Sequence, residues 1–472
     1  MLFPTTDFAI FFTGVFVIGW LLSRHVTSWQ IAMVCASYIF YGWWDWRFDF
    51  LLLLVTFVSV ITGSAIGREE NKKKRKLIMS SGVTVILSIL AWFKYYGFFI
   101  SNVDNTIAKL GFGHSLFPLL SITLPVGISF FTFMAISYVV DIYRGSILPA
   151  KPLEVATYLS FFPHLVAGPI VRGTELLPQI REKKIAGSIK IGESLWLILA
   201  GLFKKVVISS FVSTAIVNPV FQSPNSHSSI DVLFAVYGYA VQIWADFSGY
   251  TDIAIGVAQL IGIKFPQNFD SPYAAENLQD FWKRWHITLS RWLRDYLYIP
   301  LGGNRGSTWI TSRNILITMI LGGLWHGASW TFLCWGAIHG VGQVIGHIRR
   351  KYRVTSSPTV SKWRTIVARI STFHIVCFGW IFFRADTMGD AFSLIKSIFT
   401  RFEMPTILNL NIALVISASI AIQQLPRGWA QRFIATFARQ KLIVQGLISG
   451  ALLVLITTLG PQGVAPFIYY RF

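Results

Sequence analysis

Long apolar runs follow one another almost from end to end of this 472-residue chain. Only 13% of the residues are charged, whereas soluble domains have about a quarter. A bilayer core needs roughly 20 apolar residues per spanning helix. The sequence therefore predicts an all-α, multi-pass membrane protein in which some apolar segments are re-entrant. The predicted segments are Phe8–Leu22, Phe48–Ile66, Leu77–Ile100, Leu116–Val140, Leu153–Ile170, Ser194–Val217, Ile230–Ile263, Ile315–Ile348 (with an internal break), Ile366–Phe383, Ile407–Ile422 and Leu442–Leu459.

The first apolar run follows Asp7 rather than a basic region, and no small-residue cleavage site comes after it. We therefore expect a retained span and not a removed signal peptide. No internal repeat or low-complexity linker divides the sequence. The chain is predicted to be one integral membrane domain, residues 1–472, with a polar segment at 262–311 and an aromatic tail at 461–472.

The formal net charge of +20 comes largely from basic clusters in short connections, such as 72–76 and 349–353. This placement is typical of cytoplasmic loops that face anionic lipid headgroups, whereas a nucleic-acid-binding face normally belongs to a soluble module. Cys35, Cys334 and Cys377 lie far apart in apolar runs, so no disulfide framework or metal spacing is present. The sequence also lacks a P-loop, a dinucleotide fingerprint and a nucleophile elbow. We expect no nucleic-acid partner, no metal and no tightly bound cofactor.

The polar middle segment has a clear helical period over Asp280–Tyr298. Its apolar side holds Trp282, Trp285, Leu289, Trp292, Leu293 and Tyr296, and its other side is mainly basic. This pattern predicts one amphipathic helix that lies along a membrane surface. His286 projects beside the apolar stripe and should be buried, either as part of a site or as an interfacial histidine. The next stretch, Tyr298–Gly306, contains a proline and three glycines and is predicted to be a loop.

His326 is the strongest candidate for chemistry, because an ionisable group at membrane depth is costly. Gly322, Gly323 and Gly327 flank it, and glycines allow close approach or local unwinding. A buried neutral imidazole is a suitable general base. The alternative is a histidine hydrogen-bonded between packed helices, and the sequence leaves both open.

Other polar residues in apolar runs have less specific patterns. His339 is a weaker candidate on a different helical face. His164 is predicted to be structural, in a segment whose prolines, Pro163 and Pro169, indicate a kinked or re-entrant element. The stretch Gln242–Gly256 carries two aspartates, Asp246 and Asp252, and is too polar to face lipid. It should line a cavity or pair with other helices.

Several of these stretches together resemble the membrane-bound O-acyltransferases, and within them the bacterial polysaccharide branch of the alginate type. The resemblance covers nearly the whole chain, and the motifs run in family order. They are Phe161–Ile170, Asp246–Gly256, Asn268–Tyr273, Phe281–Ser290, Trp292–Arg305 and Gly322–Gly327.

This resemblance implies a ring of tilted transmembrane helices, with re-entrant and amphipathic helices, around a central cavity. Acetyl-CoA would enter from the cytoplasm and the acceptor from outside. His326 would be the catalytic histidine and His286 the second one. The residues expected to line the cavity or bind substrate are Trp325, Asp246, Asn268, Arg284, Arg294 and Asp295.

The tail Phe467–Phe472 is similar to an aromatic C-terminal motif of this branch and of a small partner in the D-alanine transfer system. The resemblance makes Tyr469 a candidate acyl acceptor, although Tyr470 stands where the motif more often has Phe. The alternative is an interfacial aromatic anchor.

The predicted function is that of a membrane O-acetyltransferase in the cytoplasmic (inner) membrane of a bacterium. It would pass acetyl groups from cytoplasmic acetyl-CoA across the membrane for O-acetylation of an extracytoplasmic polysaccharide. The expected partner is an esterase-like extracytoplasmic transferase or a small membrane protein. The alternatives are a D-alanyl transferase of the teichoic-acid type and a non-catalytic transporter.

Overall fold

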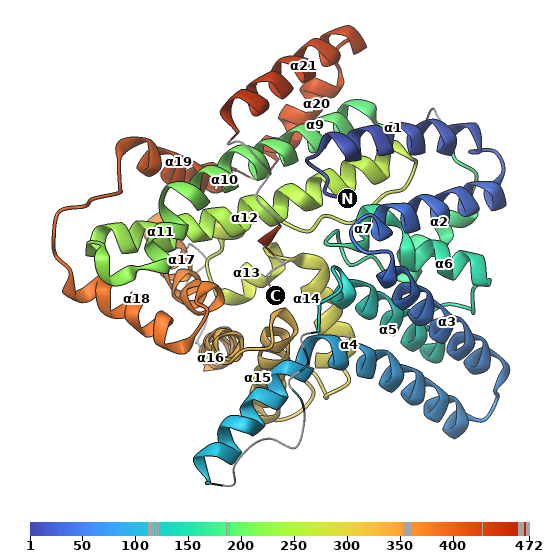
Figure 1. Ribbon diagram of the computed structural model, residues 1–472, viewed down its shortest axis with the longest axis horizontal. Coiled ribbons are helices and arrows are strands. Elements are labelled where there is room, and N and C mark those ends of the chain that lie inside the picture. Colours follow the sequence, from blue (N-terminus) through green and yellow to red (C-terminus); the bar gives the residue numbers. More distant parts are fainter. Residues whose placement is uncertain are drawn as a thin grey trace. The chain divides into compact units, whose positions relative to one another are not determined.

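The computed structural model describes residues 1–111, 118, 120, 122–185, 187, 189–352, 361–426, 428–460 and 467–468. Over these residues the chain is helical and has no strand, which confirms the all-α prediction (Figure 1). Within the same residues, six helices are long and apolar enough to cross a membrane. They are Arg47–Arg68, Lys72–Lys109, Ile191–Gln222, Ser229–Leu260, Lys362–Arg384 and Leu442–Leu459. The multi-pass membrane class is therefore confirmed, while the central cavity stays a prediction.

The chain forms two compact units. The first comprises 1–189 and 257–265, and the second comprises 190–256 and 266–472. The single domain predicted for residues 1–472 stays a prediction. Helices of the first unit are α1 (Thr6–Leu21), α2 (Val26–Gly42), α3 (Arg47–Arg68), α4 (Lys72–Lys109), α5 (Ile128–Arg144), α6 (Pro152–Ser160), α7 (Phe162–Leu165) and α8 (Gly173–Arg181).

Two features of the first unit differ from the sequence prediction. Helix α2 lies outside every predicted segment, because Thr, Ser and Gln interrupt its apolar residues. One of these, Gln30, is buried and donates to the backbone oxygen of Ile180 at 3.0 Å, so its amide does not face lipid.

The basic cluster 72–76 begins α4 and is not a loop, because the Asn71 side chain caps the helix there. The helix in 153–170 is interrupted between α6 and α7, as expected of the kinked alternative, whereas re-entrance stays a prediction.

The second unit begins with helical segments that run in line, joined by π-helical turns at 203–209 and 213–217 (Figure 1). Its helices are α9 (Ile191–Leu202), α10 (Ser210–Val212), α11 (Asn218–Gln222), α12 (Ser229–Leu260, of which 229–256 belong here), α13 (Leu278–Arg284), α14 (Ile287–Leu293), α15 (Thr308–His326), α16 (Trp330–Tyr352), α17 (Lys362–Arg384), α18 (Met388–Thr400), α19 (Leu410–Ala421), α20 (Trp429–Ala438) and α21 (Leu442–Leu459). Short 3-10 turns lie at Pro224–Ser226, Pro272–Ala274 and Ile422–Gln424, and a π-helical turn lies at Arg294–Tyr298.

Glycines allow close helix packing in this unit. A Cβ atom on Gly201 would lie 2.6 Å from the Gly249 oxygen, so α9 approaches α12 at backbone distance. A Cβ atom on Gly336 of α16 would lie 2.5 Å from the Met319 oxygen of α15. Contact between small residues is a common way for helices to associate in membranes. Helices α15 and α16 lie side by side in Figure 1, and the break predicted within 315–348 is confirmed between His326 and Trp330.

The predicted continuous helix over Asp280–Tyr298 is wrong. Helix α13 ends at Arg284, α14 starts at Ile287, and His286 between them has a φ of +42°. In a continuous helix the Ile287 N–H would donate to the oxygen four residues earlier. It donates instead to the backbone oxygen of Asn268 at 2.9 Å. The backbone oxygen of Arg284 accepts from the N–H of Asp270 at 2.9 Å. The chain at 268–270 therefore takes over hydrogen bonds that would have continued the helix. The loop predicted over Tyr298–Gly306 does follow, with Gly302, Gly303 and Gly306 at positive φ.

Candidate active site

His326 is the last residue of α15 and only 3% of its surface is exposed. Its ring packs against Trp325 at 4.9 Å, Trp335 of α16 at 5.1 Å and Phe383 of α17 at 5.1 Å between centroids. Three helices of the second unit thus surround this imidazole with aromatic rings. A histidine that acts as a base accepts the proton on its neutral imidazole, and the aromatic packing holds this ring in place.

The residue after His326 has to be small. A Cβ atom on Gly327 would lie 2.1 Å from the ring of Phe332, and one on Gly323 would lie 2.3 Å from the Phe332 oxygen. The glycines flanking His326 therefore let α16 fold back directly against the end of α15. They permit this turn by close approach, and the helix is also interrupted at Gly327, so the geometry supports both predicted roles.

His286 lies in the same unit and is fully buried. Its ring is perpendicular to that of Phe247 on α12 at 4.7 Å, and its centroid is 6.2 Å from that of Trp325. Trp325 therefore neighbours both histidines. The structure brings together four of the predicted site residues, His286, Trp325, His326 and Asn268.

Asn268 fixes the proton position on His286. Its Oδ1 accepts from the Thr288 N–H at 3.1 Å and from the Thr288 hydroxyl at 2.9 Å, and it lies 3.2 Å from Nδ1 of His286. A backbone N–H can only donate, so the atom facing it is the carbonyl oxygen of the amide. An amide oxygen can only accept, so Nδ1 of His286 must carry the hydrogen. Burial lowers the pKa of His286 to about 3, so the ring is neutral at pH 7 and Nε2 holds its lone pair.

The weaker histidine candidates have aromatic surroundings of their own. His339 on α16 is fully buried, accepts a hydrogen bond at Nδ1 from the indole of Trp282 at 3.2 Å, and stacks on Phe281. His164 in the first unit is fully buried between the rings of Phe161 and Phe265. Both sets of contacts are those of packed core residues.

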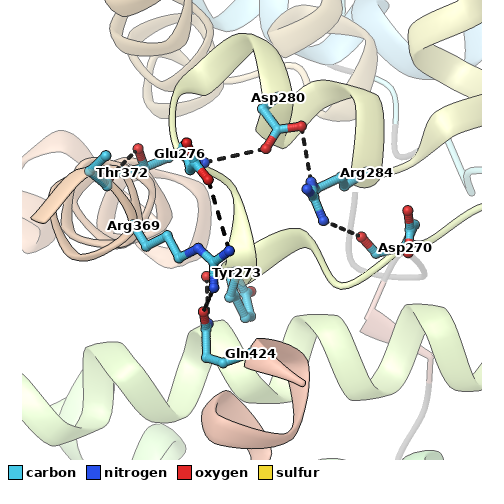
Figure 2. A network of polar contacts seen from close by, with 9 residues as sticks. Asp270, Tyr273, Glu276, Asp280, Arg284, Arg369, Thr372 and Gln424 are labelled. Carbon is cyan, nitrogen blue, oxygen red and sulfur yellow. Dashed lines mark hydrogen bonds and ion pairs between the residues drawn. The ribbon is translucent and has the colours of Figure 1, made fainter. Parts of the chain in front are cut away.

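Arg284 belongs to a polar network that ties the 270–284 segment together (Figure 2). Its guanidinium lies 3.0 Å from the carboxylate of Asp280, and it donates to the backbone oxygen of Asp270 at 3.5 Å. Figure 2 shows the network continuing from Glu276 to Arg369 of α17 and on to Gln424. Arg294 and Asp295 pair with each other at 2.6 Å in the π-helical turn, with the arginine side chain 60% exposed. A substrate role for these three residues stays a prediction.

Asp246 on α12 is buried and forms an ion pair with Lys205 of the facing helical segment. A second pair, Lys204 with Asp252, lies beside it. The stretch 242–256 thus pairs with another helix, one of the two roles left open for it. Neither lysine was predicted from the sequence to be a site residue. Two adjacent lysines inside the apolar run 194–217 could have indicated buried ion pairs there. Tyr469 lies outside the described residues.

Comparisons with known proteins identify the family of this chain. The model of the membrane-bound O-acyltransferase family matches residues 146–388, which include both histidines. The chain is 39% identical over 410 residues to a probable alginate O-acetylase, AlgI, of Pseudomonas aeruginosa, covering 85% of this chain and 75% of the relative. The chain belongs to the membrane-bound O-acyltransferase family. The predicted family and the acyltransferase class are therefore confirmed.

Two further relatives of this acyltransferase differ in their named activities. One is a peptidoglycan O-acetyltransferase of Helicobacter pylori, 35% identical over 432 residues, which cover 84% of this chain and 79% of the relative. The other is a teichoic acid D-alanyltransferase of Bacillus subtilis, 31% identical over 274 residues, which cover 55% of this chain and 68% of the relative. The similarity to the O-acetyltransferases thus extends over much more of the acyltransferase chain.

Proposed function

We propose that this acyltransferase takes acetyl from cytoplasmic acetyl-CoA and passes it across a bacterial cytoplasmic membrane for O-acetylation of an extracytoplasmic polysaccharide. The observation that carries the proposal is the 35–39% identity to named alginate and peptidoglycan O-acetyltransferases over more than four fifths of the chain. The apolar helices of the described part and the buried histidine at the end of α15 support it.

His326 acts as the general base in this proposal. Its imidazole removes the proton from an acceptor hydroxyl, the hydroxyl oxygen attacks the thioester carbonyl, and the carbon–sulfur bond breaks. The proton then passes from the imidazolium to the leaving thiolate, so that an ester and free coenzyme A result. The aromatic rings around His326 favour this role, because they exclude water that would otherwise compete with the acceptor.

The acceptor hydroxyl belongs to Tyr469 or to a partner, either an esterase-like extracytoplasmic transferase or a small membrane protein. Transfer through a carrier suits a chain whose donor and final acceptor lie on opposite sides of a membrane. Replacing Tyr469 by Phe removes the hydroxyl and leaves the ring. Loss of polymer acetylation in this variant supports the tail as carrier, and normal acetylation assigns the role to the partner.

The test of the whole proposal is His326→Ala in purified protein and in cells. General-base loss typically lowers rates by about 10²- to 10⁴-fold, so release of free thiol from acetyl-CoA and polymer acetylation should both fall by that order. His374→Ala is the matched control, since this histidine is exposed on α17 of the same unit. Near-normal acetylation in His326→Ala at equal expression removes His326 from the mechanism.

The same assay separates the other functions. A non-catalytic transporter releases no thiol from acetyl-CoA under any condition. A D-alanyl transferase, which the Bacillus subtilis relative brings into consideration, uses a D-alanyl thioester in preference to acetyl-CoA.

A further inference from the structure

A buried ion pair in the second unit holds a segment more than two hundred residues away in sequence. Lys205 and Asp246 have side chains that are each 3% exposed, and they pair between two apolar helical segments. The Oδ1 atom of Asp246 faces Lys205, while its Oδ2 accepts a hydrogen bond from the Ile468 N–H at 2.9 Å. Burying two charges is costly, so a pair that also binds main chain invites a functional explanation.

The residue before Ile468, Phe467, is also buried. Phe467 is 1% exposed, its ring centroid lies 4.7 Å from that of Tyr250, and Nζ of Lys205 lies 5.6 Å from the same centroid. A cation over an aromatic face is attracted by the ring quadrupole. The ion pair therefore contacts the segment twice, through the ring of Phe467 and through the N–H of Ile468.

Phe467 also connects this anchor, the Lys205–Asp246 ion pair, to His286 through Phe247. Its ring lies 5.8 Å from that of Phe247, and Phe247 meets the ring of His286 at 4.7 Å. The order in space is thus the anchor, Phe467, Phe247 and His286. Asp246 and Phe247 are adjacent on α12. One turn of this helix therefore accepts a hydrogen bond from Ile468 through Asp246 and contacts the ring of His286 through Phe247.

We propose that the Lys205–Asp246 pair is a docking site for the C-terminal segment of this chain, and that docking holds Phe467 against Phe247 beside His286. On this basis Asp246 and Lys205 act as positioning residues and do not bind substrate. Their effect on acetyl transfer rests on the proposed function, whereas docking itself does not.

The experiment measures how well the docked segment is protected. Ile468 is 6% exposed and binds Asp246 through its backbone, so Ile468→Cys keeps the anchor. In the full chain with Cys35, Cys334 and Cys377 replaced, the thiol introduced by Ile468→Cys is labelled with a polymer-linked maleimide in detergent. The variant Lys205→Met with Asp246→Leu removes the charges together, which leaves no lone buried charge, and it removes the acceptor. Because a hydrogen bond to a charged group contributes about 1.5–3 kcal/mol, labelling should become about ten- to hundredfold faster.

Two comparisons make the result specific. Lys205→Met with Asp246→Asn keeps an acceptor for the Ile468 N–H and should give an intermediate labelling rate. Lys204→Met with Asp252→Leu removes the neighbouring pair between the same helices and should leave the rate unchanged. If the Lys205→Met, Asp246→Leu variant does not fold, Phe467→Ala replaces it, because loss of the ring should also expose the thiol introduced at position 468.

Unchanged labelling in a folded anchor variant overturns the proposal. So does an equal increase on removing Lys204 and Asp252, because it shows general loosening of the helices. Acetyl transfer is measured in the same variants. Faster labelling together with normal transfer keeps the docking site and refutes its positioning role, and a failure of His326 as base leaves the labelling result intact.

Discussion

Replacing Asn268 by Leu tests whether one amide oxygen organises the break at His286. The side-chain oxygen Oδ1 of Asn268 accepts from the Thr288 N–H, the Thr288 hydroxyl and Nδ1 of His286. Leucine has nearly the same shape but accepts nothing, so all three donors lose this acceptor. The hydroxyl can rotate, which leaves the backbone N–H and the imidazole N–H as the costly cases. At about 1–3 kcal/mol for each buried donor, the free energy of unfolding should fall by about 2–6 kcal/mol.

The assay compares Asn268→Leu with Thr288→Val by denaturant unfolding in detergent. Thr288→Val removes only the hydroxyl donor, so it should cost about 0.5–1.5 kcal/mol and leave His286 held by Asn268. Acetyl transfer should fall further in Asn268→Leu, because His286 is no longer restricted to the tautomer with hydrogen on Nδ1. The reasoning fails if the two variants are equally stable and equally active.

Asn268→Asp completes the series by keeping an acceptor at the same place. A carboxylate beside Nδ1 favours the imidazolium, so it raises the pKa of His286 from its value near 3. The rate of acetyl transfer as a function of pH should therefore change in shape in this variant, whereas stability at neutral pH should stay closer to the parent than in Asn268→Leu.

Three further predictions concern packing, pH and the polar network. Gly327→Ala should cost about 1–3 kcal/mol in unfolding free energy because its Cβ would lie 2.1 Å from Phe332, whereas Gly446→Ala, with nothing within 4 Å, should cost nothing measurable in the same titration. The free energy of unfolding should decrease as the pH falls from about 6.5 towards 3, by up to about 1.4 kcal/mol per pH unit for His286, because His286 binds a proton in the unfolded chain but not when buried. A His286→Gln variant should show a shallower dependence of this free energy on pH. Arg284→Ala should lower the unfolding midpoint more than Arg369→Ala, because Arg284 is 12% exposed and 3.0 Å from Asp280, whereas Arg369 is 34% exposed and 3.9 Å from Glu276.

Hydropathy predicted most of the long helices because membrane spans need continuous apolar stretches. The break between α15 and α16 was also predictable, since glycine and serine follow His326 closely. Helix α2 was not, because its polar residues lower the hydropathy. Gln30 shows the difficulty: its acceptor is the backbone of Ile180, 150 residues further along the chain.

The two histidines show different limits of sequence reasoning. His326 was identified from its own neighbours, and its aromatic surroundings come from α16 and α17 as well as Trp325. His286 was predicted to be buried, and it is. The conformation that buries it was not predictable from periodicity, because the pattern of Trp282, Trp285 and Leu289 is continuous across the break.

The helix is interrupted at His286 because its backbone exchanges hydrogen bonds with 268–270, and hydropathy does not reveal such bonds. A histidine at φ +42° lies in the left-handed region that non-glycine residues seldom occupy. The surrounding bonds must therefore compensate for the strain, and Asn268 supplies several of them through both its side chain and its backbone oxygen. Strain of this kind persists where the neighbouring structure over-determines it, and it is common at functional sites. Asn268→Leu removes the side-chain acceptor, so it should lower stability and acetyl transfer together. A continuous helix in this variant would move His286 away from Trp325, which ties the break to the reaction as well as to the fold.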